Sequence, residues 1–395
     1  MNLRELFYQH VAQTSSEPLA IEIESAKGIY LYTPDGKSYM DIISGISVSN
    51  VGHCHPKVIQ AIQDQITKYM HVLVYGEMIQ SPQVLLAQRL ASMLPDNLES
   101  TYFVNSGTEA IEGAIKLAKR FTGRTEILSC FNAYHGSTHG AMSLMGNDDF
   151  TRAFRPLIPD CNRIRFGNLA DIKQITNATA AFVVEVVQGE AGVRFADNSY
   201  WKQVREHCNQ TGTLLVFDEI QTGFGRTGTL FAFEQTGVTP DILVLAKAMG
   251  GGMPIGAFIS SHEIMHSFSY NPVLGHMTTF GGHPVCCAAA LASLDIIVDE
   301  QLYKTVDRKA KLFKSLLQDL PYLKEFRQQG LMMALEWEDV QLNFKIIRHC
   351  IERGVLTDWF LFCDTAMRIA PPLIISEEEI EKACNIITNV INCKS

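Results

Sequence analysis

From about residue 101 the sequence alternates short apolar runs with segments of helical periodicity, and this alternation limits the possible folds strongly. Short apolar runs bounded by turn residues are typical of buried strands, whereas apolar residues spaced three and four apart indicate helices. The predicted strands span residues 101–104, 126–130, 181–187, 213–217, 241–245 and 255–260, with helices between several of them, for example at 109–121 and 200–210. This order predicts an α/β domain around a mostly parallel sheet.

Polar residues follow several of the predicted strands. In open α/β sheets, ligands bind beyond the carboxyl ends of the strands. The candidate functional residues are therefore the segment 105–108, Glu185, Asp218 and Lys247.

The two ends of the chain have a different pattern. The predicted elements there are a helix within 1–20, a hairpin at 28–41, helices at about 57–70, 82–93, 285–298, 302–317, 340–353 and 376–392, and a strand near 331–336. A chain of 395 residues exceeds one typical core. We therefore predict an N-terminal segment (1–50) that packs with a small domain, a large α/β domain (51–284) and a small C-terminal α+β domain (285–395).

The composition excludes some classes of function. A net charge of -9 argues against general affinity for nucleic acid or for an anionic membrane. The first residues match neither a signal peptide nor a transit peptide, and no apolar run is long enough to span a bilayer. Ten scattered cysteines without a CxxC motif are typical of reduced thiols, which predicts a cytoplasmic location. Small molecules and protein partners remain as possible ligands.

Lys247 ends a short apolar run and is followed closely by three consecutive glycines. A lysine in this position is either paired with an acid or used as an amine. Desolvation favours the neutral amine, which forms Schiff bases with carbonyl compounds. The alternative is a lysine that extends to solvent from the strand end, beside a simple glycine turn.

Three other strand ends have a functional and a structural interpretation each. Residues 104–109 form a strand end, a turn of small residues and a helix start, which suits a phosphate or an ordinary N-cap. Tyr134 follows the second strand and either stacks on a flat heterocycle or belongs to the core. Asp218 either faces a cation such as a protonated pyridine nitrogen, or caps a helix or pairs with Arg226.

Three motif matches are misleading. Residues 223–228 satisfy G-x-G-x-x-G, but five residues separate them from the strand and no helix opening follows, which argues against a dinucleotide site. Residues 262–266 satisfy H-E-x-x-H but suit a short surface helix capped by Ser261. His53, Cys54 and His55 are too close in sequence to converge on one ion, so no metal is predicted.

The segments around Lys247 (245–256) and Asp218 (218–228) resemble the class III, pyridoxal-phosphate-dependent aminotransferases of fold type I. This family includes acetylornithine, ornithine and 4-aminobutyrate aminotransferases. The resemblance covers almost the whole chain and takes in residues 52–56, 105–110, 134–136, 185–190, 278–282 and 367–372. It implies a large domain with a mostly parallel sheet and a smaller α+β domain.

The resemblance also implies the cofactor site. Lys247 would hold pyridoxal phosphate as a Schiff base and shuttle a proton, and Asp218 would keep the pyridine nitrogen protonated. Both would be catalytic. The other implied cofactor-binding residues are Gly107 and Thr108 at the phosphate, Gln221 at the ring hydroxyl, Tyr134 on the ring face, and Ser106, His135 and Glu185.

The substrate and the assembly follow from the same resemblance. Arg368 would clamp a substrate carboxylate, and Glu190 would pair with this arginine in one half-reaction and release it in the other. Thr279 would reach the cofactor phosphate of a neighbouring subunit, which implies a homodimer with composite active sites.

Four positions depart from the family pattern. Ser137 stands where relatives that use ornithine or its acetyl derivative usually have arginine, and Ile111, Met277 and His283 also differ. The sequence therefore predicts an aminotransferase that moves an amino group from an ω-amino acid or amine to a 2-oxo acid such as 2-oxoglutarate by a ping-pong mechanism, with an altered donor pocket. The alternatives are an aminomutase or decarboxylase of the same fold and, from other classes, a nicotinamide oxidoreductase or a non-catalytic binding protein.

Overall fold

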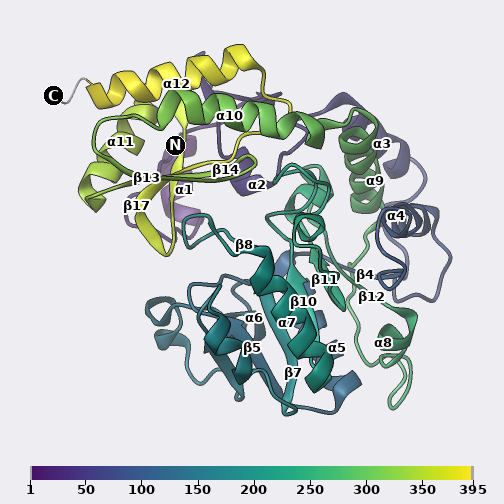
Figure 1. Cartoon of the computed structure of the whole chain (residues 1–395). Coiled ribbons are helices and arrows are strands. Elements are labelled where there is room, and N and C mark those ends of the chain that lie inside the picture. The colour runs from purple at the N-terminus through teal and green to yellow at the C-terminus, as the bar shows by residue number, and fades with distance from the viewer. Residues whose placement is uncertain (1, 393–395) are drawn as a thin grey trace.

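The structure is a computed structural model and describes residues 2–392 (Figure 1). Its α-helices are α1 (Leu3–His10), α2 (Ser44–Ser47), α3 (Pro56–Ile66), α4 (Ser81–Ala91), α5 (Gly107–Thr122), α6 (His139–Ser143), α7 (Asn198–Thr211), α8 (His262–His266), α9 (Pro284–Asp299), α10 (Val306–Leu317), α11 (Val340–Glu352) and α12 (Glu377–Asn392). Within the described part, the free thiols include Cys54, Cys130, Cys161, Cys208, Cys286, Cys287, Cys363 and Cys384, and Cys393 lies outside it.

The strands of the large sheet are β4 (Ser100–Val104), β5 (Glu126–Cys130), β6 (Cys161–Ile164), β7 (Thr179–Glu185), β10 (Leu214–Asp218), β11 (Ile242–Leu245) and β12 (Gly256–Ser260). They lie in the order β4-β12-β11-β10-β7-β5-β6. β12 is antiparallel to both neighbours, whereas the other pairings are parallel. The predicted α/β fold with a mostly parallel sheet is therefore confirmed.

Alternate residues of the buried strands supply two cores, one on each face of the sheet. In β7, Val183 packs in the core formed with α5, and Phe182 and Val184 pack in the larger core on the opposite face. That larger core contains α7 and also α9, which packs against α3 and α4. The predicted domain boundary at residue 284 stays a prediction; α9, which follows it, belongs to the core of the large sheet.

A second, smaller unit lies above the large sheet in Figure 1 and is built on an antiparallel sheet. Its strands are β13 (Leu323–Gln329), β14 (Met332–Trp337), β16 (Asp358–Phe360) and β17 (Cys363–Ile369), in the order β13-β14-β17-β16. Helices α10 and α12 pack side by side here. A further sheet joins the N-terminal strands β1 (Ser25–Lys27), β2 (Tyr30–Tyr32) and β3 (Ser38–Asp41) to β15 (Val355–Leu356).

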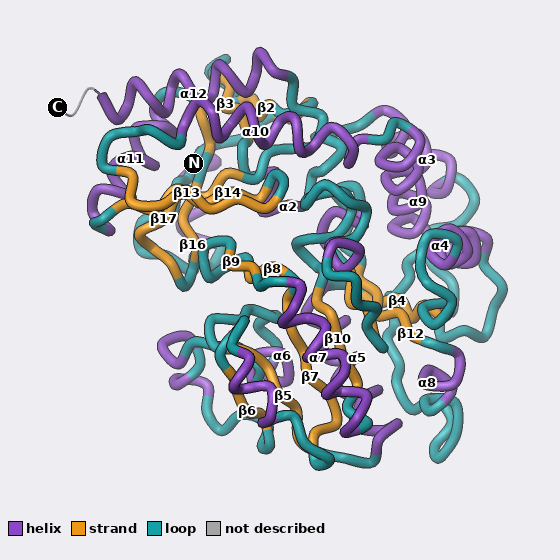
Figure 2. The backbone as a smooth tube through the Cα atoms, in the orientation of Figure 1, coloured by secondary structure: helices purple, strands orange, loops and turns teal. Residues whose placement is uncertain are grey.

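A two-stranded hairpin lies between the two units (Figure 2). It consists of β8 (Val187–Gln188) and β9 (Arg194–Phe195). Arg327 of β13 is buried and donates through Nε to the Gly192 carbonyl oxygen at 2.5 Å. The hairpin turn, which carries Glu190, is thereby fixed against the small sheet.

Several local predictions are confirmed and others are incomplete. The hairpin at 28–41 forms between β2 and β3, and α8 is a short helix whose Ser261 side chain accepts from the Ile264 N–H. No α-helix begins at the glycines of 223–228, where the chain continues through turns to a short 3-10 helix at Ala232–Gln235. Strands β6 and β13 were not predicted, because both are polar and only partly buried.

Candidate active site

A cavity of about 500 Å³ lies at the carboxyl ends of the central strands, where the sequence predicted it. The predicted site residues that line it are Ser106, Gly107, Thr108, Tyr134, His135, Ser137, Glu185, Glu190, Asp218, Gln221 and Lys247. Parallel strands bring them together because their carboxyl ends meet at one edge of the sheet. For example, Asp218 of β10 lies directly opposite Glu185 of β7 in the ladder.

Lys247 begins a 3-10 turn (Lys247–Gly250) two residues after the end of β11, in a left-handed conformation with φ of 48°. Non-glycine residues rarely adopt this conformation, and such strain is concentrated at functional sites. Burial lowers the pKa of the Lys247 amine below its usual range, and the charge of Glu190 offsets this only in part. The amine is thus biased toward the neutral, nucleophilic form.

Asp218 and His135 form a buried pair in the floor of the cavity. His135 Nδ1 lies 2.7 Å from Asp218 Oδ2, and the other carboxylate oxygen accepts from the Ile220 N–H at 3.0 Å. Burial alone would lower the pKa of His135, but the hydrogen bond and charge of Asp218 outweigh it and raise that pKa. His135 Nε2 is buried without a hydrogen-bond partner in the described part of the chain.

Glu185 and Glu219 are buried acids that hold loops. Burial raises the pKa of each to about 7. Glu185 accepts from the N–H groups of Tyr134 and Gly189, and Glu219 accepts from those of Ala232 and Phe233. The acid that caps the 3-10 helix at Ala232–Gln235 is therefore Glu219 and not Asp218.

The alternative ion pair between Asp218 and Arg226 does not form. Arg226 is fully buried and instead donates to the carbonyl oxygens of Leu331 and Pro371 and to the side chains of Ser44 and Asn50. Asp218 is left to face the cavity with His135 behind it.

The turn before α5 (residues 104–109) is an N-cap, and the predicted phosphate site there stays a prediction. Ser106 is the N-cap, and its hydroxyl accepts from the Glu109 N–H at 3.3 Å. Gly107 and Thr108 begin the helix and line the cavity, so their N–H groups lie where a helix has no internal acceptors. A Cβ at Gly136 would lie 2.4 Å from Thr108 Oγ1, so this glycine lets the Tyr134–Gly136 loop approach the turn.

Arg368 of β17 lies behind the cavity wall and is paired with Glu190. Its two terminal nitrogens donate to the two carboxylate oxygens of Glu190 at 2.9 and 2.8 Å. Both side chains are almost fully buried, with 3% and 8% of their surface exposed. Burial opposes charge on both groups, but their mutual attraction raises the pKa of Arg368 and lowers that of Glu190.

Three further groups contact the Arg368 guanidinium, and the sequence did not point to any of them. Its Nη2 donates to the Trp359 carbonyl oxygen at 3.1 Å. Asp358 Oδ1 lies 3.0 Å from Nε, and the Phe360 ring centroid lies 4.5 Å from Cζ. Burial raises the pKa of Asp358 to about 6. The antiparallel register places Asp358 opposite Arg368, and no turn signature in the sequence reveals that pairing.

Thr279 is exposed and does not line the cavity within one chain. The four positions that depart from the family pattern have different surroundings. Met277 is exposed, Ile111 is buried in α5, and His283 is the N-cap residue of α9. Ser137 lines the cavity, with its hydroxyl 3.1 Å from that of Tyr134.

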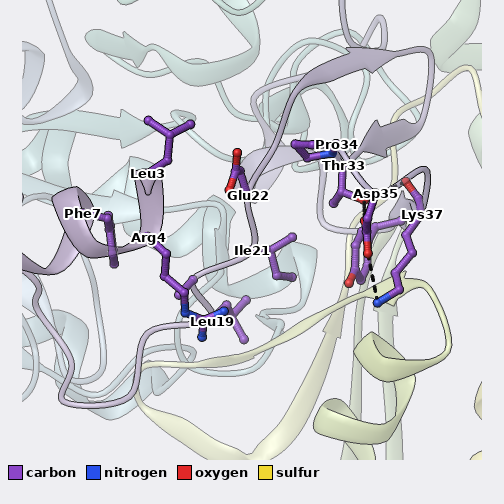
Figure 3. Close-up of a pocket in the computed structure, with 12 residues that line it drawn as sticks. Leu3, Arg4, Phe7, Leu19, Ile21, Glu22, Thr33, Pro34, Asp35 and Lys37 are labelled. Carbon is purple, nitrogen blue, oxygen red and sulfur yellow. Dashed lines mark hydrogen bonds and ion pairs between the residues drawn. The ribbon is translucent and has the colours of Figure 1, made fainter. Parts of the chain in front are cut away.

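A second cavity of about 510 Å³ lies between α1, the segment at 19–22 and the β2–β3 hairpin (Figure 3). Its charged side chains include the exposed ion pair of Lys37 and Asp35, and no predicted site residue lines it. Within residues 2–392, no cluster of three metal-ligating side chains is present. No helix in the same range is long and apolar enough to cross a membrane.

Comparisons with known proteins agree with this geometry. The family model described as "Aminotransferase class-III" matches residues 11–391. An acetylornithine aminotransferase of Methanocaldococcus jannaschii is 40% identical over 94% of each chain. An ornithine aminotransferase of Toxoplasma gondii, described with partial occupancy of PLP at its active site, superposes with a TM-score of 0.90 at 30% identity and covers 98% of this chain and 93% of its own. An acetylornithine aminotransferase of Elizabethkingia anophelis superposes with a TM-score of 0.85 at 31% identity, covering 98% of each chain.

Proposed function

The chain belongs to the class-III aminotransferase family and is a pyridoxal-phosphate-dependent transaminase, and from that premise we propose that its donor is an amine or ω-amino acid and its acceptor a 2-oxo acid such as 2-oxoglutarate. The observation that carries this proposal is the closed pair of Arg368 and Glu190. A donor without an α-carboxylate leaves this pair intact, whereas a 2-oxo acid replaces Glu190 on the guanidinium.

The residues of the cavity fit pyridoxal phosphate. An amine biased toward its neutral form, a buried carboxylate and a helix N-terminus line one cavity, in Lys247, Asp218 and the Gly107–Thr108 turn. These groups suit an aldehyde, a protonated ring nitrogen and a phosphate. When bound, the cofactor supplies an aldehyde that takes up the amino group and a ring that withdraws electrons from the reacting carbon.

The chain's own groups then have distinct tasks. Lys247 Nζ would accept the proton from the donor's amine-bearing carbon and pass it to the cofactor's aldehyde carbon within the first half-reaction. In the second half-reaction it would carry a proton in the reverse direction, to the carbon of the 2-oxo acid. The Asp218 carboxylate would hold the proton on the ring nitrogen, and His135 orients this carboxylate through its Nδ1 hydrogen bond. Gln221 and Tyr134 would contact the ring hydroxyl and the ring face.

We also infer that the protein is a homodimer whose active sites use residues of both subunits. Two segments with exposed apolar side chains, residues 70–85 and 273–280, support the homodimer. They contact each other through the rings of His71 and Phe280, whose centroids are 4.9 Å apart. The exposed apolar side chains of these segments are Met70, Leu73, Met78, Ile79, Val84, Leu85, Val273, Leu274, Met277 and Phe280. An apolar surface of this extent is typical of an interface. Thr279 lies within it.

This apolar surface borders the cavity. Thr278 accepts a hydrogen bond from Asn105 at 3.1 Å, and Asn105 lines the cavity. A partner subunit on this surface would bring its own Thr279 toward the cofactor phosphate. A cytoplasmic location is also proposed, since free thiols suit a reducing compartment.

The composite site can be tested with hybrid dimers purified through two different affinity tags. We expect Thr279→Ala to weaken cofactor binding roughly tenfold, because a hydrogen bond to a charged group is lost, and Lys247→Ala to be inactive. A hybrid of these two variants should recover about half of the wild-type activity, since one site then combines an intact Lys247 with an intact Thr279. A hybrid as weak as its parents would contradict a composite site. A wild-type/K247A hybrid is the positive control.

The donor and acceptor classes can be tested with the purified enzyme and labelled 2-oxoglutarate. We expect label in glutamate, with n-pentylamine or 5-aminopentanoate as donor and a stoichiometric carbonyl product. The visible absorbance of the bound cofactor should fall when the donor is added and return with the 2-oxo acid. Turnover of a donor without any 2-oxo acid would instead indicate a mutase or a decarboxylase, and binding of NADH on titration would favour the oxidoreductase.

A further inference from the structure

Three aromatic rings from separate parts of the chain meet beside the cavity. Phe362, between β16 and β17, lies 6.3 Å from the Tyr134 ring centroid and 5.3 Å from that of Phe150. Tyr134 follows β5, and Phe150 belongs to a short 3-10 helix at Asp148–Phe150. We name these three residues the aromatic wall. Tyr134 lines the cavity directly, so the wall flanks the side on which Ser137 lies.

The position of Phe362 is set by Glu190. The Phe362 N–H donates to the Glu190 carbonyl oxygen at 3.0 Å. The preceding N–H, of Leu361, donates to the Glu190 carboxylate oxygen Oε2, also at 3.0 Å. The same Oε2 accepts from Arg368. The aromatic wall is therefore connected by hydrogen bonds to the residue that has to leave Arg368 when a substrate carboxylate binds.

The charges around the cavity disfavour an anionic tail at this wall. The acids that line the cavity are Glu185, Glu190 and Asp218, and Lys247 is the one lysine or arginine among the described lining residues. Ser137 Oγ lies 3.1 Å from the Tyr134 hydroxyl, and the Tyr134 ring neighbours that of Phe362. Among the described lining residues, a carboxylate placed here would find no lysine or arginine other than Lys247 to offset its loss of hydration, which is costly. An apolar tail would bury its surface against the rings.

We propose that Phe362 is a specificity-determining residue that, with Tyr134 and Phe150, binds an uncharged apolar or aromatic tail of the amino donor while Glu190 is paired with Arg368. This inference rests on the proposed function and narrows its donor class from amines and ω-amino acids to amines with uncharged tails. When a 2-oxo acid displaces the Glu190 carboxylate from Arg368, the Leu361 N–H loses its acceptor. The Phe362 N–H keeps its hydrogen bond to the Glu190 carbonyl oxygen, but the neighbouring hydrogen bond is lost. The three rings of the aromatic wall are then held less firmly during the second half-reaction.

The test measures the two half-reactions separately in the holoenzyme, through the visible absorbance of the bound cofactor. In the wild type we expect 4-phenylbutylamine and n-pentylamine to react at least about tenfold faster, in kcat/KM, than 5-aminopentanoate. Phe362→Ala should slow the reaction of 4-phenylbutylamine roughly 10- to 100-fold. The same substitution should change the return reaction with 2-oxoglutarate by less than about threefold, which a general loss of structure would not do.

Two further variants keep the result interpretable. Phe154→Ala removes an exposed aromatic ring near Phe150 that lies outside the wall, and it should leave both half-reactions unchanged. Phe150→Ala removes a second member of the wall that belongs to a separate 3-10 helix and not to the small sheet, so it should reproduce part of the Phe362 effect even where Phe362→Ala folds poorly.

Two outcomes would overturn the inference. One is a wild type that prefers 5-aminopentanoate, and the other is a Phe362→Ala variant that slows both half-reactions equally or neither. A protein that shows no visible absorbance with pyridoxal phosphate, or no reaction with any donor, would contradict the proposed function itself. The two failures are therefore distinguishable.

Discussion

Replacing Lys247 with alanine is expected to reduce turnover by about 10⁴-fold or more, because the substitution removes both the nucleophile and the group that carries the proton. The amine lies at the end of β11, desolvated and held in a left-handed turn, and no other lysine lines the cavity in the described part of the chain. A neighbouring amine therefore cannot take over its task. The measurement is the steady-state rate with donor and 2-oxoglutarate.

A second readout separates loss of chemistry from loss of the fold. After borohydride reduction, the wild type should carry the cofactor covalently on Lys247, as seen in the mass of the corresponding peptide, and the variant should carry none. The matched control is Lys57→Ala, which removes an exposed lysine paired with Glu300 on the surface and should keep full activity. A Lys247→Ala variant with more than about one hundredth of the wild-type rate would contradict the assignment.

The constellation around Lys247 could be predicted from sequence because each part of it is local. Asp218 and Lys247 each follow an apolar run directly, and the Ser106–Thr108 turn joins a strand to a helix. Parallel strands place such ends at one edge of the sheet without further information. The sequence left open whether residues 104–109 cap a helix or bind an anion. The structure shows the cap, and the same geometry leaves the first N–H groups of α5 available.

The part of the site around Arg368 and Glu190 could not be predicted in the same way. Asp358, Phe360 and Phe362 approach Glu190 and Arg368 through the β16–β17 hairpin, whose register shifts at Trp359/Phe360 and whose connection lacks a Gly or Asn turn signature. Arg327 belongs to a strand of mostly polar residues, and its burial depends on contacts with Gly192 and Glu336, far away in sequence or on the neighbouring strand. Tertiary packing determines these contacts, and local periodicity carries no signal for them.

Replacing Arg368 with alanine is expected to lower kcat/KM for 2-oxoglutarate by about 10²- to 10³-fold, because a bidentate, buried partner of the substrate carboxylate is lost. The half-reaction with n-pentylamine should change much less, since this donor has no carboxylate to bind. Rates of the two half-reactions, followed by the cofactor absorbance, provide the measurement. An equal loss in both would mean that Arg368 supports the fold and does not bind the acceptor.

Replacing Glu190, the partner of Arg368, with glutamine is expected to have the opposite effect in the same assay. In Glu190→Gln the guanidinium loses its anionic competitor but keeps Asp358 at Nε, Phe360 on its face and the Trp359 carbonyl oxygen at Nη2. It therefore stays oriented for a carboxylate, and KM for 2-oxoglutarate should fall by roughly tenfold, the effect of removing a competing charge from a buried site. Arg368→Ala and Glu190→Gln should thus change the efficiency with which 2-oxoglutarate is used in opposite directions. If both raised KM, the pair would be a structural ion pair, and the carboxylate of the acceptor would bind elsewhere.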